Sequence, residues 1–463
     1  MGGCRDRSAR RCLGRGGEKG RLKEALAAEI VAKIDSLVGA PVEQWDFEAI
    51  EVAARREALR IACLAVARRF NADHSDHSGP ALPCPCGAPA RYAGRRPKTF
   101  TTALGDLKLE RAYFHCDRCE AGFCPRDRAL GLEGGSFSPH ALRMIGIVGA
   151  RVSFEEGHGL LHDLAGVDVP TKQVEREAER LGREIAEDER RVVEPDTEEP
   201  LPPTLSLGMD GTGIPMHKRA LEGRAGKQED GSSKTREVKL VTVWSAEGRD
   251  KEGVPVRDDG SITYSAAIES AASRDTDEEP SELARRVVRE AARRRFAEAP
   301  RRVVLGDGAE WIWNIAGEQF PDAVQIVDRF HANEHLSAAA KAIYGPEGDL
   351  HKEWTHQRCT ERKAGKVGDV LAALAVHSCC EGARACSEYI RRNRDRMRYG
   401  ELHATGLCTS TAVVESGCKR AIGLRLKEGG MFWSVAGANA IIALRCCLLS
   451  RRFEDFWERR AAA

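Results

Sequence analysis

The chain has 463 residues, which at about 150 residues per domain predicts roughly three domains rather than one. Its 72 Lys and Arg residues against 71 Asp and Glu residues give a net charge of +1, so the overall charge does not indicate a nucleic-acid partner. Hydrophobic residues make up 42% of the chain and charged residues 31%, which is typical of a globular protein with a substantial core. No apolar run approaches the about 20 residues of a membrane span, and no signal-like apolar region follows Met1. We therefore expect a cytoplasmic protein without a membrane partner.

The near-zero net charge hides regions of opposite sign. Residues 1–20 carry six basic and two acidic residues, which predicts a basic, disordered N-terminal segment. Residues 184–199 carry eight acidic and two basic residues and run into a proline-rich stretch, so we expect an acidic, Pro-rich linker at 193–203. The compensating basic excess lies in residues 81–130 and in the C-terminal part of the chain.

Hydrophobic periodicity predicts helices before the linker and a mixed α/β domain after it. Alanine and leucine at helical spacing indicate an N-terminal helical region over 21–79, and helical patterns return over 131–192. Residues 204–450 form one expected domain, in which strands are followed by a helix and further strands, and residues 451–463 are a tail. The expected strands are 203–216, 236–246, 261–269, 302–306 and 323–327, with a helix at 279–296 and mostly helix from about 332.

Four of the sixteen cysteines occur as two close pairs: Cys84 with Cys86, and Cys116 with Cys119. Between the pairs lies a hairpin-like segment with an expected Gly-Asp turn at 105–106. Four thiolates from two tight turns match the tetrahedral coordination of Zn²⁺, so residues 80–130 are predicted to form a zinc ribbon with a structural zinc ion. The first pair is C-x-C rather than C-x-x-C, which leaves Cys124 open as a substitute ligand. Reduced cysteines without a metal are the alternative.

Two helices separated by a short turn are expected within the region 131–192. The first runs from Phe154 to Leu164 and the second from Thr171 to Leu181, and the intervening glycine suits the end of the first. A DNA-reading helix-turn-helix has this arrangement and places its second helix in the major groove, although a plain helical hairpin gives the same pattern. The side chains that would contact DNA lie on the early turns of the second helix: Lys172, Gln173 and Arg176.

Two aspartates interrupt otherwise apolar strands of the α/β domain. Asp210 lies within Leu-Ser-Leu-Gly-Met-Asp-Gly-Thr, and Asp307 follows Val-Val-Leu-Gly. An ionised carboxylate in a strand that packs against a core is costly unless it is paired or bound to a metal. Two such aspartates in one sheet predict a site for hard cations such as Mg²⁺. The alternative is that each Asp-Gly pair forms an ordinary turn.

Glu415 is the best candidate for a third carboxylate. A glutamate from a helix would complete a two-metal site, in which the ions hold the attacking and the leaving oxygen of a phosphodiester. Positive side chains follow Glu415, and they suit a phosphate backbone because its binding is mostly electrostatic. They are Lys419, Arg420, Arg425 and Lys427.

Several strings of residues together resemble the DDE transposases of the ISKra group of bacterial insertion sequences. They are Leu-Gly-Met-Asp-Gly-Thr ending at Thr212, Gly-Asp-Gly-Ala-Glu-Trp-Ile-Trp ending at Trp313, the run from Asp328 to Leu336, and Val-Glu-Ser-Gly-Cys-Lys-Arg ending at Arg420. The cysteine motifs within 84–127 are also similar to that group. The resemblance extends from about residue 80 to about residue 450.

The resemblance implies a multidomain α/β protein with an RNase H-like core, in which Asp210, Asp307 and Glu415 are the catalytic acids and hold two Mg²⁺ ions. Residues 332–400 would form a helical insertion between the last strand and the glutamate-bearing helix, as in Mutator-like relatives. A supporting motif of those relatives matches Asp328 and His331. The implied activity is cleavage of double-stranded DNA at the element's ends and strand transfer into target DNA, by a homodimer or larger assembly at the bacterial nucleoid.

Two other functions fit parts of the sequence. Residues 331–335 read His-Ala-Asn-Glu-His, the H-x-x-E-H pattern of some zinc metallopeptidases. On a helix, His331 and His335 would share a face that binds zinc, and Glu334 would act as the base. The other alternative is a catalytically inactive element product that binds DNA without cleaving it.

Overall fold

The computed structural model describes residues 24, 27–35, 46–193, 195, 200–224, 226, 233–251, 253, 255–271, 280–409 and 412–462. The segment 1–20 and part of the expected linker 193–203 lie outside the described residues. The chain divides into two compact units, and each is described by itself. The first comprises residues 1–149 and 153–177, and the second comprises residues 150–152 and 178–463. The division falls within helix α6 (Thr171–Arg191), and the role of 193–203 as a linker stays a prediction.

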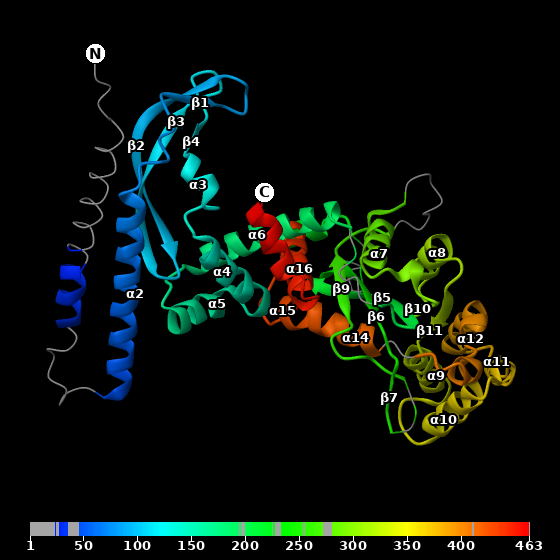
Figure 1. The fold of residues 1–463 in the computed structure, drawn as a ribbon. Helices are drawn as coiled ribbons and strands as arrows, with labels where there is room; N and C mark the ends of the chain where they lie inside the picture. Colours follow the sequence, from blue (N-terminus) through cyan, green and yellow to red (C-terminus); the bar gives the residue numbers. More distant parts are fainter. Residues whose placement is uncertain are drawn as a thin grey trace, which may run out of the picture. The chain divides into compact units, whose positions relative to one another are not determined.

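The first unit combines a long helix with a four-stranded antiparallel sheet (Figure 1). Helix α2 (Phe47–Asn71) begins at Asp46, whose carboxylate accepts a hydrogen bond from the Ala49 amide. Apolar side chains of its C-terminal half, among them Phe70, pack on a buried cluster that includes Phe100 and Leu109. The strands pair in chain order: β1 (Ala81–Pro83), β2 (Pro89–Thr102), β3 (Gly105–His115) and β4 (Gly122–Phe123).

The expected turn of the β2–β3 hairpin was misplaced. The turn residues are Ala103 and Leu104, and Gly105 already belongs to β3. The Thr102 hydroxyl accepts a hydrogen bond from the Leu104 amide and donates one to the Gly105 carbonyl, which closes the turn two residues earlier than predicted.

Short helices complete the first unit. They are α3 (Pro125–Ala129), α4 (Pro139–Arg151, whose last two residues fall in the second unit), α5 (Phe154–Leu160), the π-helical turn η2 (Leu161–Ala165) and the start of α6. Ser153 and Glu156 form a reciprocal capping box at the start of α5, and Gly166 ends η2 in the left-handed conformation. Both expected helices of the helix-turn-helix are therefore present, and a π-helical turn closes the first.

The second unit is built on a mixed five-stranded sheet of order β11-β10-β5-β6-β9. The central strand β5 pairs in parallel with β10 and antiparallel with β6, β6 pairs antiparallel with β9, and β10 pairs in parallel with β11. The strands are apolar and mostly buried, as expected for a sheet covered on both faces. Their bounds are β5 (Thr204–Pro215), β6 (Thr235–Trp244), β9 (Thr263–Ala267), β10 (Arg301–Gly306) and β11 (Val324–Val327). A two-stranded ribbon lies outside this sheet: β7 (Gly248–Arg249) and β8 (Pro255–Val256).

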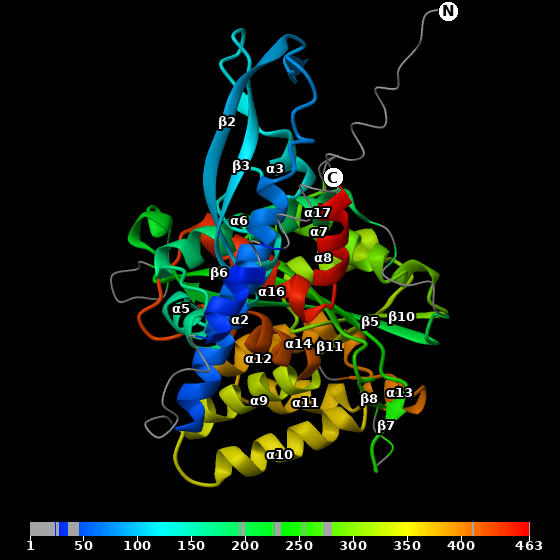
Figure 2. The same cartoon turned by 60° about the vertical axis from the view of Figure 1, so that its left-hand side comes forward.

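Helices connect and cover the sheet. The connections to the parallel strands run through α7 (Glu282–Arg293) and α8 (Glu310–Gln319), with 3-10 turns at η3 (Lys218–Leu221) and η4 (Phe296–Glu298). After β11 a group of helices gathers beside β10 and β11 (Figures 1 and 2). It consists of α9 (Arg329–Tyr344), α10 (Leu350–Lys363), α11 (Val367–Ala375), α12 (Glu381–Asn393), η5 (Arg394–Arg396) and α13 (Tyr399–Ala404).

The chain then returns to the sheet. The returning elements are α14 (Ala412–Gly417), the π-helical η6 (Cys418–Gly423), α15 (Leu424–Leu426), α16 (Val435–Leu449) and α17 (Phe453–Ala462). The apolar helix α16 packs against β9, where Asn439 accepts a hydrogen bond from the Ile268 amide. The mixed α/β, multidomain prediction is confirmed, and every expected strand of the second unit is present within a few residues. No helix in the described ranges has the length and hydropathy that crossing a bilayer requires.

A buried ion cluster joins α7, β9 and the C-terminal segment of the second unit. The Glu290 carboxylate is fully buried and accepts two hydrogen bonds from Arg452, at 2.7 and 2.9 Å, and one from the Thr263 hydroxyl at 2.6 Å. Arg293 lies 3.5 Å from the same carboxylate. Burial alone would raise the pKa of Glu290, but Arg452 first, and then Arg293 and Thr263, lower it to about 2.

We expect Glu290→Gln to destabilise the protein at neutral pH by about 3–5 kcal/mol, because it leaves Arg452 buried without its counter-charge. The pKa of Glu290 is about 2 in the folded state and near 4.5 for an unperturbed Glu. The ionised Glu290 carboxylate therefore contributes its full amount to the free energy of unfolding above pH 4.5, and this contribution is lost as the pH falls towards 2. Denaturant unfolding across that pH range should therefore show the wild type converging on the variant. The matched control Glu282→Gln removes an exposed carboxylate of the same helix and should cost under about 1 kcal/mol at every pH. If the difference in the free energy of unfolding between the wild type and Glu290→Gln does not depend on pH, Glu290 does not have the lowered pKa assigned to it.

Candidate metal centre and carboxylate site

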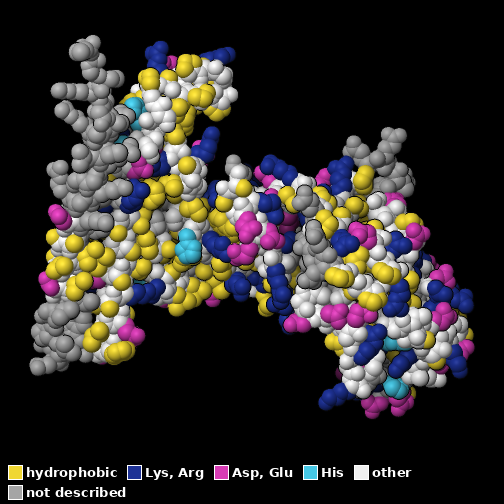
Figure 3. Space-filling view, viewed as in Figure 1, with side chains coloured by type: hydrophobic (Ala, Val, Ile, Leu, Met, Phe, Trp, Pro, Cys, Tyr) yellow, Lys and Arg dark blue, Asp and Glu magenta, His cyan; other side chains and the backbone are white. Residues whose placement is uncertain are grey.

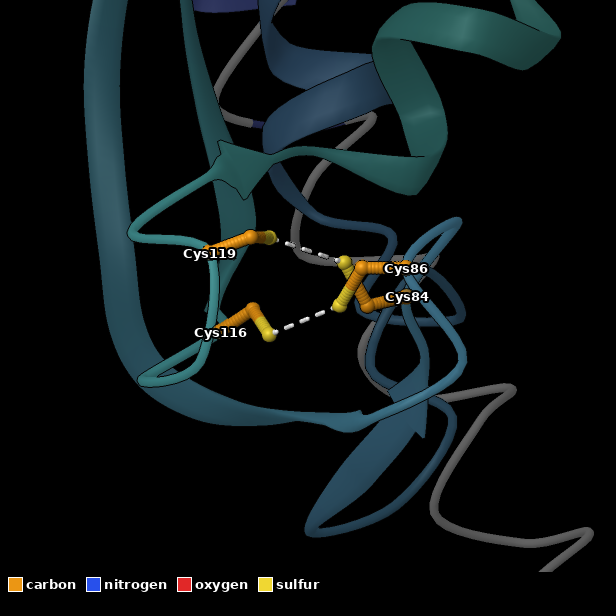
Figure 4. A group of neighbouring side chains, drawn as sticks. All are labelled: Cys84, Cys86, Cys116 and Cys119. Carbon is orange, nitrogen blue, oxygen red and sulfur yellow. Dashed lines mark hydrogen bonds between the residues drawn. The ribbon is translucent and has the colours of Figure 1, made fainter.

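The four paired cysteines sit in two tight turns of the first unit. Cys84 and Cys86 lie between β1 and β2, and Cys116 and Cys119 lie between β3 and β4. Backbone hydrogen bonds close both turns: the Cys84 amide donates to the Ala88 carbonyl and the Cys116 amide to the Ala121 carbonyl, each at 2.9 Å. Antiparallel pairing of the strands brings the two turns together, and the four side chains point towards one another (Figure 4).

The sulfur positions fit a tetrahedral metal site. Cys84 Sγ lies 3.5 Å from Cys119 Sγ, and Cys86 Sγ lies 3.6 Å from Cys116 Sγ. All four ligand atoms lie within 4.8 Å of one another. A zinc ion with four Zn–S bonds of about 2.3 Å requires sulfur separations of about 3.8 Å. The four cysteines could thus hold a structural metal such as zinc after only small adjustments.

Cys124 does not belong to this cluster. It is the residue before α3, its side chain is buried, and among the described residues the metal-compatible group contains only the four paired cysteines. Burial raises the pKa of the Cys124 thiol, and the pKa of Cys84 is also raised, to about 12, so the exclusion of Cys124 rests on its position rather than on its pKa. By contrast, hydrogen bonding from the Cys119 amide is the main cause that lowers the pKa of Cys116, to about 7.

The strand register of the second unit aligns three aspartates on three neighbouring strands. Leu305 of β10 pairs with Gly208 of β5, and Val327 of β11 pairs with Gly306 of β10. Continuing the same register by one or two residues places side by side the aspartates Asp210, Asp307 and Asp328. The hydrogen bond from the Asp328 amide to the Gly306 carbonyl, at 2.8 Å, shows that the parallel pairing reaches this point. We call this line of residues the carboxylate edge.

Asp210 and Asp307 are close enough to influence each other. Burial raises the pKa of Asp210, hydrogen bonds from the Cys418 thiol and the Gly211 amide oppose this rise, and the Asp307 carboxylate adds to it. Asp210 lies inside β5, which continues to Pro215, so the alternative of a turn at this Asp-Gly pair is wrong. Asp307 does begin a turn, and its carboxylate accepts a hydrogen bond from the Ala309 amide at 2.8 Å.

The helix that carries Glu415 crosses the face of the sheet on which Asp210 lies. Val414 occupies the space above Gly208, where any larger side chain would collide with it, and the Cys418 thiol bonds Asp210. Gly417 packs against β6 and β9. Val414 and Gly417 thus face the sheet, and Glu415 lies on the same helix between them in the chain.

Glu415 is nevertheless exposed, and its carboxylate does not form a compact ligand group with the two aspartates. Within the described ranges, only the cysteine cluster gathers three or more metal-ligating atoms within 4.8 Å. The strand register thus places Asp210 beside Asp307, whereas Glu415 is exposed and stands outside any compact ligand group with them. Carboxylate oxygens are the ligand type that hard cations such as Mg²⁺ prefer, and a magnesium ion at these aspartates stays a prediction.

Helices α9 and α12, which follow β11, contact the carboxylate edge. The Tyr389 hydroxyl of α12 donates a hydrogen bond of 2.7 Å to the Asp307 carbonyl, and its ring lies 2.6 Å from where a Cβ on Gly308 would stand. His335 of α9 stacks on Tyr389 with ring centroids 3.8 Å apart. Asp328 is buried and caps α9 by accepting a hydrogen bond from the His331 amide. Asp328 and His331, the expected supporting residues, therefore lie beside the site.

The residues of the H-x-x-E-H pattern occupy one turn of α9. His331 Nδ1 lies 3.7 Å from Glu334 Oε2, and burial is the main cause that lowers the pKa of His335. The stacking of His335 on Tyr389 directs one of the two expected zinc ligands against a protein ring. The described residues offer no third ligand within 4.8 Å of both histidines.

The expected DNA-contacting residues have different surroundings. Lys419, Arg420 and Lys427 are exposed, whereas Arg425 is fully buried, with its guanidinium 5.2 Å from the centroid of the Trp433 ring. The prediction of a phosphate contact for Arg425 is therefore wrong, because the sequence could not distinguish a buried cation–aromatic contact from an exposed cation. Over the face of the second unit that Figure 3 displays, basic and acidic side chains are interspersed.

The three residues on α6 lie at the start of that helix in the first unit. Lys172 is exposed and pairs with Glu175 at 2.7 Å, Arg176 is exposed, and Gln173 is half-buried. The Thr171 hydroxyl donates a hydrogen bond of 2.6 Å to Glu155, which ties the two helices of the motif together.

Two residues of the site were missed from the sequence. Cys418 follows the apolar Val414 by four positions, and this helical spacing could have indicated a second side chain facing the strands. Tyr389 is 82 positions from Asp307 in the chain, and no local pattern indicates their contact. A comparison of the chain with protein-family models and with curated proteins finds no match.

We expect the purified protein to contain one zinc ion per chain, and Cys116→Ser to lose it together with the folded structure of the ribbon, because a small domain of this kind depends on its metal. Elemental analysis of metal content and native mass spectrometry measure this directly. Cys124→Ser is the matched control, since Cys124 is also buried and nearby in the sequence but lies outside the cluster. Zinc lost in the control, or kept in Cys116→Ser, would contradict the assignment.

Proposed function

We propose that this protein is a DDE transposase of the ISKra type, which binds the ends of a bacterial insertion sequence and catalyses DNA strand cleavage and strand transfer. The observation that carries the proposal is the carboxylate edge: Asp210 and Asp307 on neighbouring parallel strands, with the Glu415 helix packed across the same face. The sheet, in which three antiparallel strands are extended on one side by two parallel strands, supports an RNase H-like core.

The roles of the residues follow from their positions. Asp210 and Asp307 would hold two Mg²⁺ ions, with Glu415 as the third acidic ligand. Mg²⁺ bound there supplies charge stabilisation to the attacking and leaving oxygens of a phosphodiester. The Cys418 thiol orients the Asp210 carboxylate, and the Tyr389 hydroxyl fixes the backbone of Asp307. The helices after β11, α9 to α13, would correspond to the expected insertion between the last strand and the Glu415 helix.

Binding to double-stranded DNA would involve both units. The exposed Lys419, Arg420 and Lys427 follow Glu415 along the chain and suit the phosphate backbone near the carboxylate edge. The helix-turn-helix residues at the start of α6 and the zinc ribbon would recognise the element's ends. Because two ends must be held together during transposition, the working form would be a homodimer or a larger assembly.

We expect Asp210→Asn to abolish cleavage of DNA that carries the element's ends and to leave binding to that DNA intact, because it removes a metal-binding charge without changing the shape of the side chain. Cleavage in Mg²⁺ and electrophoretic mobility shifts measure the two effects separately. Asp369→Asn, which changes an exposed aspartate on α11, is the matched control and should keep both activities.

The same assays separate the competing functions. Retained cleavage in Asp210→Asn would exclude the DDE assignment. If His335→Ala abolishes a proteolytic activity that Asp210→Asn leaves unchanged, the zinc peptidase is correct. A wild-type protein that binds its element's ends but cleaves nothing in Mg²⁺ would be an inactive element product.

We also expect Tyr389→Phe to reduce cleavage by about tenfold and to raise the Mg²⁺ concentration needed for half-maximal activity, because the Asp307 carbonyl loses its donor. The Mg²⁺ titration distinguishes a positioning role from a loss of folded protein, which would lower activity equally at all concentrations. Tyr344→Phe is the matched control: its hydroxyl, on α9 of the same insertion, contacts His377 and not the carboxylate edge. An unchanged Mg²⁺ dependence in Tyr389→Phe would show that this hydrogen bond does not position Asp307 for metal binding.

A further inference from the structure

A short ledge extends β5 beyond the sheet. Met216 forms a bridge with Trp433, the His217 amide donates to the Trp433 carbonyl at 2.9 Å, and the Trp433 amide donates to the Pro215 carbonyl at 3.2 Å. Because side chains alternate in extended chains, the pairing that buries Met216 and Trp433 turns their neighbours His217 and Phe432 outwards. We call this aromatic pair and the backbone that carries it the aromatic ledge.

Trp433 anchors the aromatic ledge on its buried side, and Phe432 is exposed on the other side. The Trp433 indole donates a hydrogen bond of 3.1 Å to the Leu426 carbonyl, and its ring packs under the Arg425 guanidinium. The Phe432 side chain is 57% exposed, which is unusual for a large aromatic residue. Its neighbour Trp433 is buried and hydrogen-bonded. The phenyl ring is therefore presented to solvent by a firmly anchored backbone.

The spacing of the two rings matches an inserted planar group. The ring centroids of His217 and Phe432 are 6.4 Å apart, with the planes tilted by 33°. Stacked bases are separated by about 3.4 Å, so a base between two rings needs about 6.8 Å between them. Because the rings lie closer than this and are tilted, the exposed Phe432 side chain would have to rotate before a base enters.

Exposed basic residues on both segments of the ledge could attract phosphate, although Glu222 and Glu428 lie on the same segments. Lys218 and Arg219 follow His217 and are exposed, and Lys427 is exposed on the segment that leads to Phe432. Lys427 Nζ donates a hydrogen bond of 2.5 Å to the Thr212 hydroxyl, two residues along β5 from Asp210. Cations and an aromatic pair together are the composition of surfaces that bind single-stranded nucleic acid.

The ledge and the carboxylate edge share one strand. Seven residues separate Asp210 from His217, which at about 3.3 Å per residue sets an upper limit of roughly 23 Å between them. At about 3.4 Å per nucleotide, this span corresponds to about seven nucleotides or fewer. Lys427 bonds Thr212 between the two, and because His217 is an odd number of positions from Asp210, a DNA strand that reaches both sites must pass around the end of β5.

We propose that the aromatic ledge captures one unpaired base of a DNA strand by stacking it between His217 and Phe432, within about seven nucleotides of the phosphodiester at the carboxylate edge. This inference rests on the proposed function and adds that the DNA end is partly unpaired when it is bound. A base is favoured over an apolar protein segment because Phe432 is a single exposed ring, with Lys218, Arg219 and Lys427 near it in the chain.

The test measures binding of the full-length protein, without Mg²⁺, to DNA that ends in a few unpaired nucleotides and carries the fluorescent base 2-aminopurine at successive positions. Stacking quenches this fluorophore, so we expect quenching at one position within about seven nucleotides of the cleavage point. Phe432→Ala should remove the quenching and weaken binding by about 5- to 100-fold, the range of one base–aromatic stack. Phe432→Tyr should restore both, and Phe432→Leu, which keeps an apolar side chain without the aromatic face, should not.

A fully paired blunt duplex is the second arm of the test. Its affinity should change less than threefold in Phe432→Ala, because no free base reaches the ledge. Equal loss on both DNAs, or full activity of Phe432→Leu, would overturn the proposal while leaving the transposase assignment intact. If the protein binds neither DNA, both the proposed function and this inference fail.

Discussion

The second unit is organised around a carboxylate placed inside a buried strand. Asp210 interrupts the apolar run of β5, and its burial raises its pKa, which means that the ionised form is costly there. The neighbouring groups lower that cost: the Cys418 thiol and the Gly211 amide donate to the carboxylate. A second aspartate in the same register increases the cost again. Two carboxylates brought together in this way are a pattern that marks candidate functional sites, and the proposed function depends on it.

The two candidate metal sites differ in ligand type and in exposure to solvent. The cysteine cluster is closed: four soft ligands from two turns surround one position, and the small sheet of the first unit would gain its stability from the metal. The carboxylate edge is open, with hard oxygen ligands along one line of strands and Glu415 on an exposed flank. The helical insertion supports this edge through backbone contacts. Tyr389 bonds the Asp307 carbonyl, and Tyr399 similarly bonds the Val327 carbonyl at the end of β11.

Sequence patterns predicted those parts of the structure that depend on local chemistry. Apolar runs located the strands, and the paired cysteines located the metal-compatible cluster, because both signals are carried by neighbouring residues. The alignment of Asp210 with Asp307 could be expected only as two strands in one sheet, since register depends on long-range pairing. Contacts such as that of Tyr389 with Asp307 arise from packing between distant helices and have no local signature. The hairpin turn was misplaced because the Thr102 side chain, rather than the Gly-Asp pair, decides where the chain reverses.

Burial also changes what the basic C-terminal region means. The sequence counts every arginine there as available to DNA, yet the structure buries several of them in internal contacts: Arg362, Arg425, Arg445 and Arg452. Arg452 neutralises Glu290, and Arg445 donates to the carbonyls of Ala150, Arg420 and Ala421. The regional charge excess therefore overstates the positive surface. Each buried guanidinium removes one counterion-releasing contact, so binding to DNA would depend on salt less steeply than the arginine count implies.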